Sequence, residues 1–236
     1  MEVLKVVSFD IWGTLLDLTK FYSTLSRKVS LLCGKRYEEV FELILTTYRK
    51  ALAVRLGGGF SRVVIESAEF FSRELGITVE QLFQALAMSI DEPEISELAY
   101  LDAAEALEAV RASGYATAAL GNVMFWPGMV TRYFLYKNGL LKYFDLTVFS
   151  DEVGIQKPSR EVFEYVARKL GASVGEIVHV GDSPENDLAG ALIAGARAVL
   201  IKRDSPIGVV RLGTSAYLIN DLRKLVEVLR ELGEAS

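Results

Sequence analysis

Three apolar stretches of the sequence each end at a polar residue that could take part in chemistry. Asp10 follows VLKVVSF, Asn122 follows YATAALG, and Asp182 follows EIVHVG. Lys157 lies in the segment GIQKPSR, and Asp187 comes five residues after Asp182. Together these side chains offer a carboxylate that can act as a nucleophile, an amide, further acids and a base.

The three carboxylates could not share one site without added positive charge. Two carboxylates 4 Å apart repel by about 4 kcal/mol at an effective dielectric constant near 20, and one lysine cannot offset three acids. A hard divalent cation can, and Mg²⁺ is typically held by one or two carboxylates together with water and substrate phosphate. Asp10, Asp182 and Asp187 therefore indicate a Mg²⁺ site if the fold brings them together.

Short apolar segments that alternate with helical patterns must position these residues. The pattern predicts strands over residues 3–10, 115–122, 145–152, 176–182 and 198–202. Helical periodicity between and after them argues for an α/β fold, a doubly wound Rossmann-like parallel sheet. In such a sheet ligands bind at the carboxyl ends of the strands, which is where the candidate residues fall. The single histidine, His179, lies inside a predicted strand, and we expect it to pack in the core, away from the site.

Residues 17–98 carry helical patterns with no strand between them. Glycines and new N-caps such as Thr78 divide this segment into four expected helices, at 18–34, 36–59, 61–76 and 78–90. We therefore predict two domains: a Rossmann-like catalytic core formed by residues 1–16 and 99–236, and an all-helical cap inserted at residues 17–98.

Composition and charge exclude several classes of partner. The chain of 236 residues is 51% hydrophobic and has a formal net charge of −5, with scattered lysines and arginines. This argues against binding to nucleic acid or to an anionic membrane surface. No apolar run reaches the roughly 18 residues of a spanning helix, and a single cysteine, Cys33, forms no internal disulfide. We expect a cytoplasmic protein, and the sequence leaves its oligomeric state open.

Four segments resemble the motifs of the haloacid dehalogenase-like hydrolase superfamily in their order and spacing: FDIWGTLLD, LGN, GIQKPSREVF and HVGDSPENDLAGA. The resemblance covers the whole chain, including the helical cap. It implies that Asp10 attacks the substrate to form a covalent aspartyl intermediate, which water then hydrolyses.

The resemblance also implies roles for the remaining motif residues. Thr14 and Asn122 would hold the transferring group, and Lys157 would neutralise its charge and that of Asp10. Mg²⁺ would be bound by Asp10, Asp182, Asp187 and the main-chain carbonyl of Trp12. Trp12 and Gly121 would be next to the substrate.

Trp12 departs from the phosphatase pattern of the family. Phosphatases usually carry there a second aspartate, the general acid that protonates the leaving oxygen, and tryptophan cannot do this. General acid catalysis is typically worth 10²- to 10⁴-fold, or about 3 to 5 kcal/mol. A phosphatase without it is expected to be slow on alkyl phosphates. An aromatic residue at this position is typical of 2-haloacid dehalogenases, whose halide leaving group needs no acid.

The fourth motif favours the phosphatase interpretation. The dehalogenases work without metal and carry Ser and Asn where this chain has Gly181 and Asp182. They also carry a tyrosine where this chain has Phe163, and a cap arginine for which Arg49 is the only candidate we can offer. Three carboxylates in one site, Asp10, Asp182 and Asp187, require a bound cation. We therefore favour a Mg²⁺-dependent phosphatase that acts on a small phosphorylated metabolite.

Two alternatives stay open. One is a 2-haloacid dehalogenase, which the aromatic Trp12 favours. The other is a non-catalytic relative that only binds a phosphate ligand. Gly121 counts against both enzymatic interpretations, phosphatase and dehalogenase, because most members of either kind have there a Ser or Thr whose hydroxyl binds the substrate.

Overall fold

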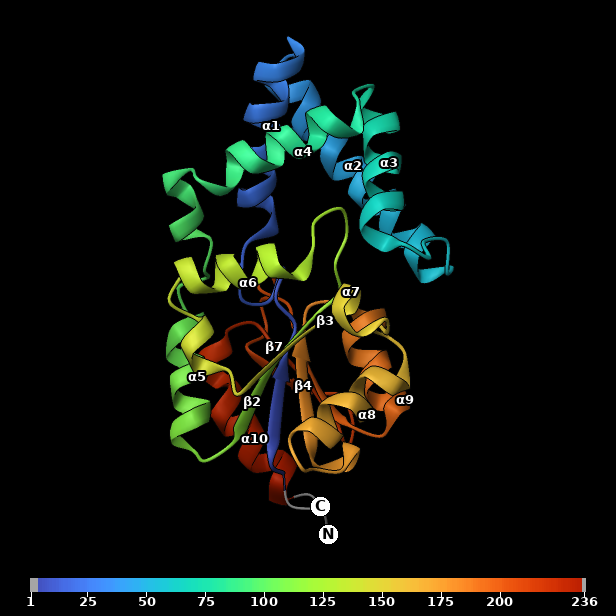
Figure 1. Ribbon diagram of the computed structural model, residues 1–236. Helices are drawn as coiled ribbons and strands as arrows, with labels where there is room; N and C mark the ends of the chain where they lie inside the picture. Colours follow the sequence, from blue (N-terminus) through green and yellow to red (C-terminus); the bar gives the residue numbers. More distant parts are fainter. Residues whose placement is uncertain (1–3, 235–236) are drawn as a thin grey trace. The chain divides into compact units, whose positions relative to one another are not determined.

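The computed structural model describes residues 4–234 and divides them into two compact units (Figure 1). The core unit comprises residues 4–16, 99–122 and 139–234, and the cap unit comprises residues 17–98 and 123–138. The sequence analysis placed all of 99–236 in the core, whereas the structure groups residues 123–138 with the helices of the cap unit.

The core unit is built on a seven-stranded sheet in the order β3-β2-β1-β4-β5-β7-β6. The strands are β1 (Val6–Phe9), β2 (Ala116–Gly121), β3 (Leu146–Phe149), β4 (Ile177–Gly181), β5 (Arg197–Ile201), β6 (Val209–Arg211) and β7 (Ala216–Ile219). All neighbouring pairs are parallel except β6 and β7, which are antiparallel. The predicted α/β class with a doubly wound sheet is confirmed. The sequence analysis did not predict β6 and β7, which are only three and four residues long.

Helices cover both faces of this sheet, as Figure 1 shows. One side carries α5 (Ala103–Ala112) and α10 (Leu225–Glu234), and the other carries α8 (Arg160–Lys169) and α9 (Gly190–Ala194). The central strands β1, β4 and β5 are buried on both faces, as expected for a covered parallel sheet. No helix within residues 4–234 is long and apolar enough to cross a membrane.

The order of the strands reverses at the centre of the sheet. From β1 the chain moves outward through β2 and β3, and it then returns to place β4 on the other side of β1. Strands β1 and β4 run in register, with Ser8 opposite His179 and Phe9 opposite Val180. The crevice beyond such a switch point is the usual ligand site of open α/β sheets. Asp10 and Asp182 are the residues that directly follow these two strands.

The cap unit consists of α1 (Leu18–Cys33), α2 (Tyr37–Leu56), α3 (Val63–Leu75), α4 (Val79–Ile90), a short 3-10 helix (Pro93–Glu97) and α6 (Gly128–Lys137). The four expected helices are present with nearly the predicted bounds. Asp17 caps α1 by accepting hydrogen bonds from the Thr19 and Lys20 amides, and Thr78 caps α4 in a reciprocal pair with Gln81.

Aromatic packing explains why residues 123–138 belong to the cap unit. The ring of Phe21 in α1 lies 5.1 Å from Trp126 and 4.9 Å from Phe134, and Phe125 lies 4.4 Å from Phe71 in α3 (centroid distances). These side chains are at most 3% exposed. Their burial supplies much of the apolar area that holds the cap helices together.

Candidate active site

Asp10 is fixed by the short loop that follows β1. Its main-chain amide donates to the carbonyl of Val180 in β4 at 2.8 Å, which extends the pairing of the two strands by one residue. The Thr14 hydroxyl donates to Asp10 Oδ2 at 3.3 Å. Arg203 donates to the Thr14 carbonyl at 2.7 Å and to Asp102 Oδ2 at 2.8 Å. The loop therefore folds back so that Thr14 contacts Asp10, and the Arg203 guanidinium holds the loop in this conformation.

Gly13 allows the loop to approach Asp182 closely. Its φ is +88°, in the left-handed region that favours glycine. A Cβ at this position would lie only 2.3 Å from Asp182 Oδ2. Gly13 is therefore required both by the backbone conformation and by the space that the Asp182 carboxylate occupies.

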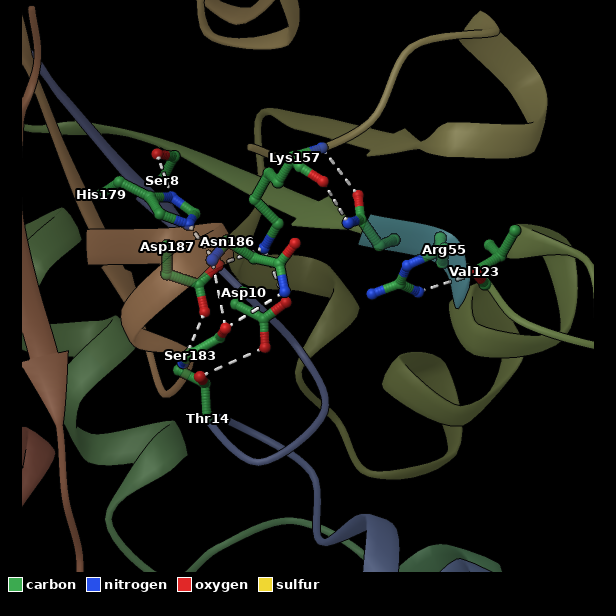
Figure 2. Close-up of polar contacts among 11 residues, drawn as sticks. Ser8, Asp10, Thr14, Arg55, Val123, Lys157, His179, Ser183, Asn186 and Asp187 are labelled. Atoms are coloured by element: carbon green, nitrogen blue, oxygen red, sulfur yellow. Dashed lines mark hydrogen bonds and ion pairs between the residues drawn. The ribbon is translucent and has the colours of Figure 1, made fainter. Parts of the chain in front are cut away.

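Lys157 is the cation in direct contact with the acids. Its ammonium donates to Asp10 Oδ1 and to Asp187 Oδ1, both at 2.7 Å, and the side chain is 1% exposed (Figure 2). Burial alone would lower the pKa of Lys157, but Asp10 and Asp187 outweigh that effect and raise it above its usual value. Lys157 is therefore charged at neutral pH and bridges the two carboxylates.

Asn122 holds the backbone of Lys157. Its Nδ2 donates to the Lys157 carbonyl at 2.8 Å, and its Oδ1 accepts from the Lys157 amide at 2.9 Å. The sequence analysis expected Asn122 to hold the transferring group. In the structure its amide pairs with the Lys157 main chain, which positions the lysine and leaves one Nδ2 hydrogen, so the contact with the transferring group stays a prediction.

Asp187 is fixed by three donors. Oδ1 accepts from Lys157 and lies 3.0 Å from His179 Nε2, and Oδ2 accepts from the Ser183 amide at 2.9 Å. It lies in the π-helical turn Pro184–Ala189, which precedes α9. Gly181 makes room for this carboxylate, because a Cβ there would lie 2.2 Å from Asp187 Cγ.

His179 is the residue that the sequence analysis assigned to the core and away from the site. It is fully buried in β4, as expected, but its ring bridges Ser8 and Asp187. Burial and the charge of Lys157 lower its pKa below the usual value, so the ring is neutral at pH 7. The sequence signal for this contact was that His179 lies in the strand that ends directly before Asp182.

The acids lie close enough to perturb one another. One carboxylate oxygen from each of Asp10, Asp182 and Asp187 lies within 4.8 Å of the other two. Burial raises the pKa of Asp10 to about 6 against the opposing charge of Lys157, and Asp187 adds to the rise. Burial, then Asp10 and Asp187, raise the pKa of Asp182 to about 7. Burial also opposes ionisation of Asp187, but Lys157 and the His179 hydrogen bond outweigh it and hold that pKa well below its usual range.

This donor set fits a divalent cation. Three carboxylates lie together beside the Lys157 ammonium, and burial, with a contribution from the neighbouring acids, raises the pKa of two of them, Asp10 and Asp182. Carboxylate oxygens are the ligands that Mg²⁺ prefers. Asp10, Asp182 and Asp187 would hold the ion, and the Trp12 carbonyl, two residues after Asp10, stays a predicted fourth ligand.

The structure thus brings together Asp10, Thr14, Asn122, Lys157, Asp182 and Asp187, all within the core unit. Gly121 is the last residue of β2, and a Cβ there would lie 3.0 Å from Ile11 Cδ1 and 3.1 Å from Phe149 Cδ1. A serine at this position would need both neighbours to shift. Phe163 packs edge-on against His179, with the ring centroids 5.3 Å apart.

Comparison with known proteins identifies relatives of this arrangement. The model of the haloacid dehalogenase-like hydrolase family matches residues 4–195. The chain is 25% identical over 249 positions to the glyceraldehyde 3-phosphate phosphatase of Methanothermobacter thermautotrophicus, with 96% of this chain and all of that protein covered. It is 31% identical over 99 residues to pyrimidine 5'-nucleotidase YjjG of Escherichia coli, a match that spans 40% of this chain and only 42% of that enzyme.

A solved structure agrees with these matches. The HAD phosphatase from Thermococcus onnurineus superposes with a TM-score of 0.65 at 27% identity, covering 96% of this chain and 98% of that one.

Proposed function

The chain belongs to the haloacid dehalogenase-like hydrolases, and from that premise we propose that it is a Mg²⁺-dependent phosphatase of small phosphorylated metabolites. The observation that carries this proposal is the convergence of Asp10, Asp182 and Asp187 within 4.8 Å. A haloacid dehalogenase needs no metal, and an additional buried acid beside its nucleophile would only be a liability. We assign the chemistry to the core unit, since it contains all of these acids.

Asp10 is the nucleophile of this proposal. Its Oδ1 carries the 2.7 Å bond from Lys157, whereas Oδ2 accepts the longer, 3.3 Å bond from Thr14. Oδ2 is therefore the oxygen better able to attack. It forms a bond to phosphorus while the ester oxygen leaves with the bonding electrons. A water then attacks the same phosphorus, which breaks the acyl phosphate and restores the Asp10 carboxylate.

Positive charge must balance the phosphoryl oxygens and the acids. When bound, Mg²⁺ would polarise the phosphoryl group and offset the charge of Asp10 and Asp182. Lys157 keeps Asp10 ionised and oriented. Asn122 fixes the lysine backbone through its two hydrogen bonds. This arrangement supplies electrostatic stabilisation at fixed positions, which needs little reorganisation during the reaction.

The leaving group receives no proton from position 12. Trp12 has no ionisable group, so the departing alkoxide takes its proton from water. We therefore expect the enzyme to prefer substrates whose leaving group is already a weak base. Two of the relatives named above are a glyceraldehyde 3-phosphate phosphatase and a pyrimidine 5'-nucleotidase, which supports a small phosphorylated metabolite as the substrate class.

A panel of phosphate esters and 2-haloacids, each assayed with Mg²⁺ and with chelator, tests this proposal. We expect phosphate release that requires Mg²⁺ and is lost in Asp10→Asn. The exposed Asp91→Asn is the matched control and should keep full activity. Halide release in the presence of chelator would instead establish the dehalogenase, which Trp12 favours. Phosphate binding without turnover that survives Asp10→Asn would establish a non-catalytic relative.

A further inference from the structure

The buried histidine is part of a continuous chain of polar contacts that runs from Ser8 to Asp10, the proposed nucleophile. Ser8 Oγ lies 2.8 Å from His179 Nδ1, and His179 Nε2 lies 3.0 Å from Asp187 Oδ1. The same Asp187 oxygen accepts from Lys157, which donates to Asp10 (Figure 2). Ser8 and His179 are 0% exposed, and Asp187 and Lys157 are 2% exposed. Solvent therefore does not replace these contacts if one is lost.

The partners of the ring determine its tautomer. An ionised carboxylate can only accept hydrogen bonds, so His179 Nε2 must carry the proton that it shares with Asp187. In a neutral ring Nδ1 then has a lone pair, and the Ser8 hydroxyl, which can donate or accept, donates to it. The pairing of β1 with β4 sets this contact, because Ser8 and His179 are register partners on adjacent strands.

We propose that His179 is a positioning residue that, held as its Nε2–H tautomer by Ser8, orients the Asp187 carboxylate toward Lys157. Asp187 Oδ1 receives both donors, from His179 and from Lys157, while the Ser183 amide holds Oδ2. These three donors fix the rotation of the carboxylate. Without His179, Asp187 Oδ1 would keep only one of its two donors, the Lys157 ammonium.

Packing alone does not explain a histidine at this position. The surroundings of the ring include the edge of Phe163, and an apolar side chain of similar volume would fill the same space in the strand. A ring with two hydrogen-bonding nitrogens is needed only if both of its polar neighbours, Ser8 and Asp187, must be satisfied in the interior. Partners that orient the ligands of a metal commonly affect metal affinity or activity by about 10- to 100-fold.

The tautomer can be read directly, because the chain contains one histidine. Protein carrying ¹⁵N-labelled imidazole and no histidine tag gives one pair of ring nitrogen signals in a long-range ¹H–¹⁵N correlation spectrum. We expect a protonated Nε2 and an unprotonated Nδ1 in the wild type at pH 7.5. Ser8→Ala should shift the Nδ1 signal. A ring protonated at Nδ1 alone would overturn the proposal, whatever the activity of the protein.

Two substitutions of His179 then distinguish a role in orienting Asp187 from a role in core packing. His179→Leu keeps the volume and removes both polar contacts, whereas His179→Gln keeps an amide donor that can reach Asp187. We expect His179→Leu to weaken Mg²⁺ binding, measured by calorimetry, and to lower kcat at saturating Mg²⁺, each by about 10-fold or more, with little change in KM. His179→Gln should recover part of both losses.

A folded His179→Leu variant with wild-type Mg²⁺ affinity and kcat would show that the histidine only packs. If that variant does not fold, the tautomer in the wild type and the response to Ser8→Ala still decide the question. The kinetic part rests on the proposed function, and the spectrum does not. Loss of phosphatase activity in Asp10→Asn tests the proposed function separately, so the two failures are distinguishable.

Discussion

Lys157 and Asp10 are 147 residues apart in the chain, yet the Lys157 ammonium donates to the Asp10 carboxylate at 2.7 Å in a buried site. The same ammonium holds Asp187 at the same distance. One lysine thus connects the end of β1 to the turn after β4, and its positive charge is what allows the acids to be buried next to each other.

Replacing this lysine should therefore affect stability as well as activity. We expect Lys157→Met to abolish phosphate release and, in chelator, to lower the free energy of unfolding by about 3 to 5 kcal/mol, because it leaves buried carboxylates uncompensated. Urea denaturation measures the change. Mg²⁺ should restore part of the lost stability. The exposed Lys169→Met, on α8, should change the stability by less than about 0.5 kcal/mol. Equal stability of Lys157→Met and the wild type in chelator would contradict this account.

The acidic cluster predicts how stability depends on pH in the absence of metal. The pKa values of Asp10 and Asp182 are raised in the folded state, to about 6 and about 7, so the folded protein binds these protons more tightly than the unfolded chain. Their stabilising contribution is fully present below the unfolded pKa of about 4. It is lost as pH rises through 6 and 7.

We therefore expect the metal-free protein to be less stable at pH 8 than at pH 5, by on the order of 3 kcal/mol from these groups. The lowered pKa of Asp187 acts in the opposite sense, and its stabilisation is lost only as pH falls below about 4. Denaturant titrations at both pH values measure the difference. Asp182→Asn should reduce it and Mg²⁺ should remove it. An increase in stability from pH 5 to pH 8 in chelator would disprove the assignment.

Under the proposed function, we expect position 12 to determine which phosphate esters are hydrolysed well. We expect Trp12→Asp to raise kcat/KM for alkyl phosphates, by up to about 10²-fold, because it introduces a general acid for the leaving oxygen. Turnover of p-nitrophenyl phosphate, whose leaving group needs no proton, should change little. Trp12→Asn controls for the loss of the indole ring without adding an acid. If both variants affect alkyl phosphates equally, the absent acid does not limit the wild type.

Gly181 is predicted to be essential for the placement of Asp187. A Cβ at this position would lie 2.2 Å from Asp187 Cγ and 2.3 Å from Oδ2, so the carboxylate must move away from Lys157 and His179. We expect Gly181→Ala to destabilise the protein by about 1 to 3 kcal/mol and to weaken Mg²⁺ binding in calorimetry. Gly233→Ala, in α10, meets nothing within 4 Å and should stay within about 1 kcal/mol of the wild type. Unchanged Mg²⁺ affinity in Gly181→Ala would show that the position of Asp187 does not matter for the metal.

Local sequence patterns were sufficient to predict the elements that carry the site. The apolar runs before Asp10, Asn122 and Asp182 are strands, and the four helical patterns of residues 18–90 are helices, because periodicity reports which side chains are buried. Asp10 and Asp182 could be recognised since each directly follows a strand at the edge where parallel strands end. The β6–β7 pair could not be predicted in this way. β6 has three mostly exposed residues and shows no apolar run, and β7 is a four-residue strand that pairs with it in antiparallel orientation.

The sequence by itself determined the strand ends and the cap helices, and it predicted which groups take part in the reaction. Only the tertiary structure decided that residues 123–138 pack with the cap aromatics, that Asn122 pairs with the Lys157 backbone, and that His179 contacts Asp187. Each of these depends on which distant segments become neighbours. Ser8 and His179, for example, meet across 171 residues because β1 and β4 pair in register. Periodicity along one segment carries no information about such a partner, since hydrogen bonds and ring contacts form between whichever groups the sheet order and the packing of the helices place side by side.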